Sequence, residues 1–180
     1  PRDFSKYSYR WFRRELALQE WSGGYTIKAV TDRRGRAMPH TVVDTMMRVE
    51  LRQPIRAGER FRLTIEYSYP IVNAAVIGGR GGYEALEEDG AEIFTIAQWY
   101  PRMAVYGPDT GWQNKAFLGR GEFALEFGDF EVALTVPADH VVAASGTLKN
   151  PRSVLTSTQR KRLKQARKTF DKPVLIVNGD

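Results

Sequence analysis

The sequence of 180 residues contains no cysteine and only two histidines. Without cysteine the chain can form neither disulfides nor thiolate metal sites. His40 and His140 lie far apart in the sequence, and no His-Glu-x-x-His motif, the common source of two imidazole ligands for zinc, is present. We therefore predict no metal site, no cofactor and no catalytic residue in this chain.

Other signatures of catalysis and of membrane insertion are also missing. The sequence has no Gly-x-Ser-x-Gly elbow, and carboxylates such as Glu87 and Glu88 belong to one polar run typical of a loop. No apolar run approaches the roughly 20 residues that a membrane-spanning helix needs. We expect a soluble chain, either cytoplasmic or periplasmic or secreted in a bacterium.

The net charge of +6 suggests nucleic acid as a partner, because lysine and arginine neutralise phosphates. The excess is local, however, since six basic residues lie between Arg160 and Lys168. A general nucleic-acid surface is therefore disfavoured, and no nucleic-acid partner is predicted.

Alternating apolar and polar residues dominate the first half of the chain. They predict a strand over Tyr25–Val30, a turn at Asp32–Gly35, and two further strands over Thr45–Leu51 and Phe61–Tyr67. We expect Thr45–Leu51 to pair with the first strand and with Phe61–Tyr67. Each such strand has one apolar face that a second layer must cover. The pattern predicts a mainly β fold, a two-layer antiparallel β-sandwich with a saddle-like form, as a single domain over residues 1–180.

The expected core takes one phase from each alternating run: Val49, Leu51, Leu63, Ile65, Phe130, Val132 and Leu134. One short α-helix near the carboxy-terminal end is predicted over Ser157–Thr169, because Thr156 and Gln159 form a capping box. Val174–Val177 after it has the composition of a strand. Residues 1–24 show no clear period and are compatible with a strand and loop or with a helix over Arg10–Leu18.

The stretch from Phe94 to Pro151 interleaves aromatic, amide and charged residues. Its motifs occur in the order Ala97-Gln98-Trp99-Tyr100-Pro101, Asp109, Lys115-Ala116-x-Leu118 and Phe130-Glu131-Val132-Ala133-Leu134-Thr135-Val136-Pro137. Two further motifs lie upstream of this stretch, Gln53-Pro54-Ile55-x-x-Gly58 and the Phe61–Tyr67 run. In this order they resemble the amino-terminal domain of the aminopeptidase N family, bacterial-type zinc metallopeptidases of the gluzincin group. The resemblance spans roughly Tyr25 to Val177.

The resemblance implies a longer parent chain whose catalytic domain follows and carries His-Glu-x-x-His and zinc. It implies that Gln98 and Tyr100 help bind the amino-terminal end of a peptide substrate, although the family usually has Gln or Glu where Tyr100 stands. A phenol can still accept one hydrogen bond. Because Pro101 favours an extended residue before it, we expect Gln98 and Tyr100 on one face and Trp99 on the other. Trp99 and Trp112 are then candidates for the domain interface.

Each of these residues also has a structural interpretation. The amide of Gln98 can bridge two loop backbones, and the rings of Trp99 and Tyr100 can fill apolar space. A different class of function is also open, that of a stand-alone β-sandwich that binds peptide, glycan or nucleic acid on a platform of Trp99, Tyr100 and Trp112.

Overall fold

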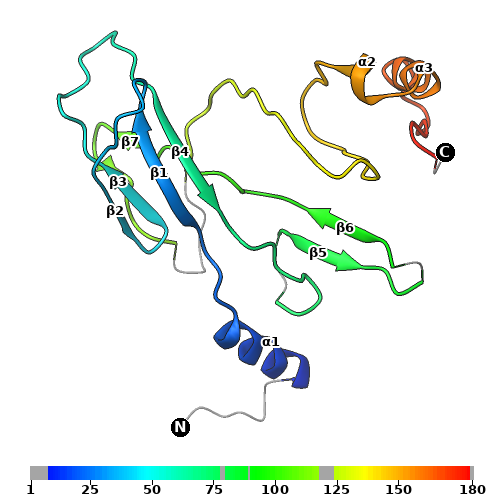
Figure 1. Ribbon diagram of the computed structural model, residues 1–180, viewed down its shortest axis with the longest axis horizontal. Coiled ribbons are helices and arrows are strands. Elements are labelled where there is room, and N and C mark those ends of the chain that lie inside the picture. Colours follow the sequence, from blue (N-terminus) through cyan, green and yellow to red (C-terminus); the bar gives the residue numbers. More distant parts are fainter. Residues whose placement is uncertain (1–7, 78–79, 89, 118–123, 179–180) are drawn as a thin grey trace. The chain divides into compact units, whose positions relative to one another are not determined.

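The computed structural model describes residues 8–77, 80–88, 90–117 and 124–178, and its secondary structure is mainly β (Figure 1). The chain divides into two compact units, Pro1–Gly128 and Asp129–Asp180, which are described separately. All strands found in the described residues belong to unit 1. The expectation of a single domain over the whole chain stays a prediction.

Unit 1 begins with helix α1, Tyr9–Glu20. Ser8 caps it, since its hydroxyl oxygen accepts a hydrogen bond from the Trp11 amide at 3.2 Å. The helix then runs through residues of high helix propensity, such as Arg14 and Ala17. The helical alternative for residues 1–24 is therefore the correct one, and the expectation of a helix only near the carboxy-terminal end was wrong.

Strand β1, Thr26–Asp32, pairs antiparallel with β4, Leu63–Ser68, and the two lie side by side in Figure 1. Thr26 is opposite Ser68 and Asp32 is opposite Leu63, with an irregularity between Ile27 and Ala29. Along β4, the apolar positions are less exposed than the polar ones between them, as the alternation predicts. Both strands were predicted correctly.

The partners of these strands differ from the prediction. Strand β3, Met46–Val49, pairs with β2, His40–Val43, instead of with β1 or β4. Between β2 and β3, Asp44 adopts a left-handed φ of 49°, which aspartate tolerates better than most residues. The predicted pairings were wrong because this tight turn pairs β3 with the strand directly before it, so that β2 supplies its backbone hydrogen-bond partners.

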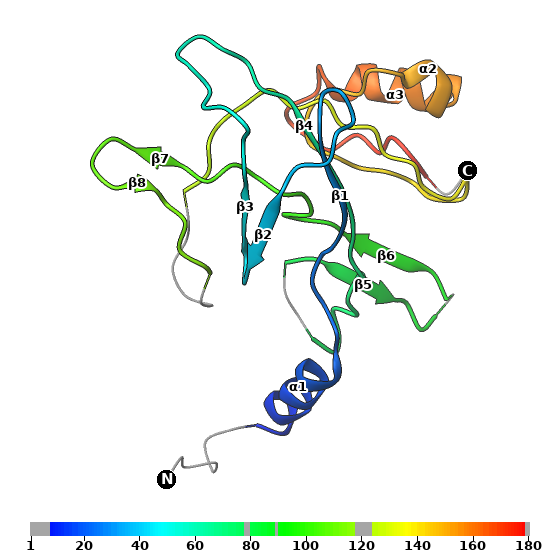
Figure 2. The ribbon, with the colours of Figure 1, turned by 60° about the vertical axis from the view of Figure 1, so that its left-hand side comes forward.

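Unit 1 contains two further hairpins (Figure 2). Strands β5, Gly82–Ala85, and β6, Glu92–Thr95, form one, and β7, Tyr106–Gly107, and β8, Gly111–Trp112, form the other. In the described ranges, the strands thus form four separate two-stranded antiparallel sheets. Antiparallel β structure is confirmed, and the sandwich expected from the sequence is not seen among these described strands.

The buried apolar side chains of the described residues are Val30, Met38 and Ile77. Of the predicted core, Val49, Leu63 and Ile65 are half-buried, as their place on β3 and β4 requires.

The other four predicted core residues are exposed: Leu51 at 36%, Phe130 at 59%, Val132 at 53% and Leu134 at 51%. None of them lies in a strand. The alternating pattern marks one apolar face but supplies neither the neighbouring strand nor the covering layer that would bury it.

Unit 2 contains helices α2, Pro151–Val154, and α3, Ser157–Ala166. The capping box of α3 is confirmed: the Gln159 amide donates to the Thr156 hydroxyl at 3.2 Å, and the Thr156 amide donates to the Gln159 side chain at 2.9 Å. The helix ends before Thr169, and Phe170 beyond it is 92% exposed. The predicted strand Val174–Val177 is absent, because no described segment pairs with it.

Candidate functional site

Three tyrosines gather where β1 begins and β4 ends. Tyr25 precedes β1, Tyr67 belongs to β4, and Tyr69 lies two residues further along. Side chains two residues apart in an extended chain share a face, and the antiparallel register, with Thr26 opposite Ser68 and Ile27 opposite Tyr67, brings Tyr25 close to both tyrosines. The ring centroid of Tyr25 lies 5.2 Å from those of Tyr67 and of Tyr69, in edge and tilted contacts. We call these three residues the tyrosine cluster.

The tyrosine cluster holds the loop that follows β6. The Tyr25 hydroxyl donates a hydrogen bond to the Gln98 carbonyl oxygen at 3.2 Å. The Tyr67 hydroxyl donates to the Trp99 carbonyl oxygen at 3.0 Å. Two consecutive carbonyls of an irregular loop thereby receive donors that no strand partner supplies. The motif that carries the resemblance is thus fixed to the β1–β4 pair at its backbone.

The environment of the cluster favours neutral phenols. Burial raises the pKa of Tyr25, and the negative charges of ionised Tyr69 and Tyr67 raise it further. Burial likewise raises the pKa of Tyr67, with a smaller contribution from Tyr69, and burial raises that of Tyr69. The hydroxyls of Tyr25 and Tyr67 therefore remain hydrogen-bond donors to the loop well above neutral pH.

Gln98 adopts a left-handed backbone conformation with φ of 51°. This conformation costs a residue with a side chain about 1 kcal/mol or more, and the hydrogen bonds to the loop offset it. It also interrupts the extended backbone that would place Gln98 and Tyr100 on one face. The expected alternation of faces through Gln98–Tyr100 was therefore wrong.

The side chains of this loop are accessible to differing degrees. Gln98 is exposed, whereas Trp99 and Tyr100 are half-buried. The rings of Trp99 and Tyr100 contact each other edge to face, with centroids 5.2 Å apart and planes at 78°. Gln98 thus offers an amide to solvent, while the two aromatic residues form a compact pair beside it.

Trp112 lies in β8, on a different hairpin from Trp99 and Tyr100. Its ring packs edge to face on Tyr106 at 5.2 Å, and it is 53% exposed. Its role at a domain interface stays a prediction. Asp109 lies in the turn of the β7–β8 hairpin, and Lys115 follows β8. Leu118, which belongs to the same motif as Lys115, lies outside the described residues.

The two histidines lie in different units. His40 Nδ1 is 3.1 Å from the Met38 carbonyl oxygen, and His140 Nδ1 is 2.9 Å from Asp139 Oδ1. The hydrogen bond with His140 lowers the pKa of Asp139. Over the described ranges, no three residues of the metal-binding types cluster, and no helix is long and apolar enough to cross a membrane.

The tyrosine cluster was not predicted from the sequence, although it fixes the backbone of the loop. A signal was present: Tyr67 and Tyr69 stand two residues apart at the end of a strand, which places two hydroxyls on one face. The Gln98–Tyr100 loop, in contrast, lies about thirty residues after Tyr67, and the spacing of residues along the sequence does not predict contacts over that distance.

The chain was compared with protein-family models, curated proteins and solved structures, and no significant match was found in any of the three.

Proposed function

We propose that this chain is the amino-terminal, non-catalytic domain of a zinc-dependent aminopeptidase. In this proposal it packs on the catalytic domain of the same chain, which holds the zinc, and it helps to bind the amino-terminal end of a peptide substrate. The ordered motifs around Gln98, Lys115 and Phe130 support the family, because they resemble its amino-terminal domain in sequence and order.

The observation that carries the proposal is the amount of surface left uncovered. The accessible surface is 16,384 Å². A compact protein of this mass exposes about 9,000 Å², and two separate compact bodies of the same total mass about 10,000 Å². Large apolar side chains make up part of the excess, among them Val43 at 61%, Ile93 at 49% and Trp112 at 53% exposure. Such surface is typical of a part that packs on another part.

We infer further that the separate strand pairs belong to a two-layer, saddle-like sandwich that is completed when the domain packs. The alternation along β4 supports this, since Leu63, Ile65 and Tyr67 share one less exposed face. A face of this kind needs a second layer. The catalytic domain, or segments ordered by it, would supply that cover.

The loop Gln98–Tyr100 is the part of the chain that we assign to substrate. Its backbone is fixed by Tyr25 and Tyr67, and its Gln98 amide faces solvent. A fixed backbone with an accessible amide and a neighbouring phenol suits recognition of a free amine, which donates hydrogen bonds to side-chain oxygens. The loop has no group that would itself cleave a peptide bond, so we assign it binding and no catalysis.

The substrate assignment is tested with Tyr100→Phe in the full-length parent. Losing one hydrogen bond to a charged group costs about 1.5 kcal/mol, so kcat/KM for a free-amine substrate should fall about tenfold. An amine-blocked substrate should lose nothing. Tyr106→Phe is the matched control, since Tyr106 lies on the β7–β8 hairpin and is 59% exposed. Equal losses on both substrates would indicate packing, and no loss on either would remove Tyr100 from the site.

One observation favours the second candidate, a stand-alone module that binds peptide, glycan or nucleic acid. The rings of Tyr106 and Trp112 form an exposed aromatic pair on which a flat ligand could stack. The platform expected from the sequence is divided, however, because Trp112 packs on Tyr106, whereas Trp99 packs on Tyr100. A stop codon directly after Asp180 would favour this candidate.

A further inference from the structure

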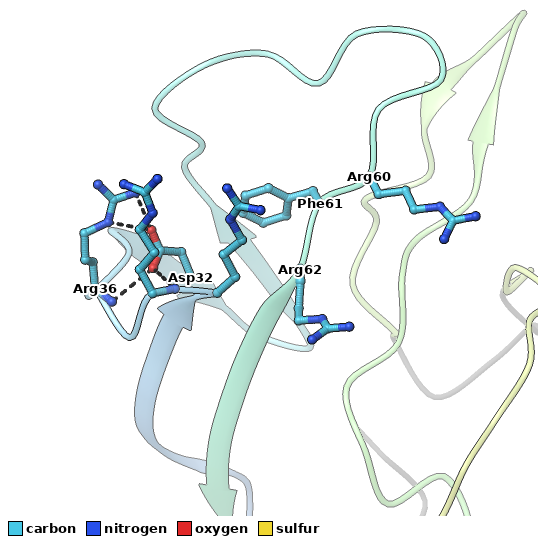
Figure 3. Close-up of a pocket in the computed structure, with 7 residues that line it drawn as sticks. Asp32, Arg36, Arg60, Phe61 and Arg62 are labelled. Atoms are coloured by element: carbon cyan, nitrogen blue, oxygen red, sulfur yellow. Dashed lines mark hydrogen bonds and ion pairs between the residues drawn. The ribbon is translucent and has the colours of Figure 1, made fainter.

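A hollow of about 240 Å³ lies at the end of β1, next to the residues that lead into β4 (Figure 3). Its lining is mostly cationic: Asp32, Arg33, Arg34, Arg36, Arg60, Phe61 and Arg62. Five arginines and one carboxylate therefore contribute to the lining. We call this the arginine hollow.

The β1–β4 pairing explains how two distant arginine runs meet. Asp32, the last residue of β1, is opposite Leu63, the first residue of β4. The residues after β1 and the residues before β4 must therefore lie at the same end of the strand pair. This places the turn at Arg33–Arg36 beside Arg60–Arg62, although more than twenty residues separate them.

Asp32 fixes the turn side of the hollow. Its Oδ1 accepts hydrogen bonds from the Arg34 amide at 2.8 Å and the Arg36 amide at 3.1 Å. Its Oδ2 accepts a hydrogen bond from Nε of Arg36 at 2.7 Å and forms an ion pair with Nη2 of the same residue at 2.6 Å. Gly35 completes the turn with a φ of 74°, a conformation that glycine adopts without strain. The backbone that carries Arg33 and Arg34 is thus held in one conformation.

The charge of the hollow is not balanced by the protein. Asp32 pairs with Arg36, whose side-chain hydrogen bond lowers the pKa of Asp32 to about 2. Within the described part of the chain, Arg33, Arg34, Arg60 and Arg62 form no ion pair. Four positive charges therefore remain, two on the turn side and two on the strand side.

Guanidinium groups bind phosphate through paired, charge-assisted hydrogen bonds, more specifically than an ammonium does. The volume lies below the roughly 300 to 1,000 Å³ of pockets for drug-sized molecules, which suits a compact anion. In Figure 3, Phe61 stands between the turn and Arg60, while Arg60 and Arg62 extend away from Asp32. Closing around an anion thus requires rotamer changes, which exposed side chains make within nanoseconds.

We propose that the arginine hollow binds a small ligand that carries two adjacent phosphate groups. One phosphate is held from the turn side by Arg33 and Arg34, and the other from the strand side by Arg60 and Arg62. The site does not depend on the proposed peptidase role, so failure of one leaves the other standing.

The test is calorimetric titration of the 180-residue chain with inorganic diphosphate, with monophosphate and with a tricarboxylate of similar charge, at low and at physiological salt. Diphosphate should bind at least tenfold more tightly than either other anion. The double variants Arg33→Gln/Arg34→Gln and Arg60→Gln/Arg62→Gln should each weaken it at least tenfold. The control Lys164→Gln/Arg167→Gln removes the same charge from unit 2 and should change binding less than twofold.

A further variant separates geometry from charge. Arg33→Lys/Arg34→Lys keeps the charge but removes the planar fork, and it should weaken diphosphate binding several-fold. If this variant binds like the unmodified chain, if the unit 2 control weakens binding equally, or if diphosphate has no advantage, the proposal is wrong.

Circular dichroism checks that each variant folds. Should a double variant unfold, amide chemical shifts of the unmodified chain decide. Diphosphate should shift amides of Arg33–Arg36 and Arg60–Arg62, and shifts confined to other residues would overturn the site.

Discussion

Replacing Tyr67 by phenylalanine tests whether the tyrosine cluster holds the Gln98–Tyr100 loop. The change removes the hydroxyl that donates to the Trp99 carbonyl at 3.0 Å but keeps the ring that contacts Tyr25. One such hydrogen bond contributes about 1 kcal/mol to the free energy of unfolding. Tyr25→Phe should cost no more than this, because its 3.2 Å bond to Gln98 is longer and more exposed.

The double variant should lose less than the sum of the two single changes. Either hydroxyl alone still holds the loop, and with it the left-handed conformation of Gln98, which costs about 1 kcal/mol. When both hydroxyls are gone, the loop is released and that strain is relieved, which offsets most of the second loss. We therefore expect about 1 kcal/mol for each single variant and little more for the double variant.

Urea unfolding followed by tryptophan fluorescence measures these differences, because all four tryptophans lie in unit 1. Tyr69→Phe is the matched control: its ring belongs to the same cluster, but its hydroxyl makes no hydrogen bond to a described residue, so its stability should be unchanged. Unchanged stability in Tyr67→Phe, or an equal loss in Tyr69→Phe, would refute the role of the two hydroxyls.

Three further changes test other parts of the structure. Gly82→Ala should destabilise unit 1 by about 1 to 3 kcal/mol in urea unfolding. The added Cβ would lie 2.6 Å from the Val72 carbonyl oxygen, and the φ of 147° at this position strains a residue with a side chain. An unchanged unfolding midpoint would contradict this geometry. The side-chain hydrogen bond from Arg36 lowers the pKa of Asp32 from its usual 3.8 to about 2 in the folded chain. The stabilising effect of Asp32 is therefore present above its usual pKa and is lost as the pH falls toward 2; carboxyl NMR titration should give this pKa, and Arg36→Gln should return it toward 3.8. Thr156→Ala should cost α3 about 1 kcal/mol through loss of the capping box, seen as faster amide exchange at Gln159, and equal exchange would show that the cap contributes nothing.

Local sequence signals predicted local structure well. Alternation located β1 and β4, and the Thr156–Gln159 pair located the start of α3, because both patterns act within a few residues. Pairing was predicted poorly, because the turn at Asp44 decides the partner of β3, and no periodicity encodes that choice.

The candidate site was predictable only in part. The motif around Gln98 marked the loop, but its conformation depends on hydroxyls from Tyr25 and Tyr67, which are distant in sequence. The arginine hollow was missed for the same reason: Arg33–Arg36 and Arg60–Arg62 become neighbours only through the β1–β4 register. The apolar phase of Phe130–Leu134 predicted burial, whereas burial requires a covering layer that this stretch does not have.

The most direct test of the proposed function is to determine the coding sequence beyond Asp180 and to express the full-length product. We predict a His-Glu-x-x-His motif within the next few hundred residues, one zinc ion per chain by elemental analysis, and hydrolysis of amino-acid arylamides. A stop codon directly after Asp180, or a full-length product with neither zinc nor aminopeptidase activity, would contradict the assignment.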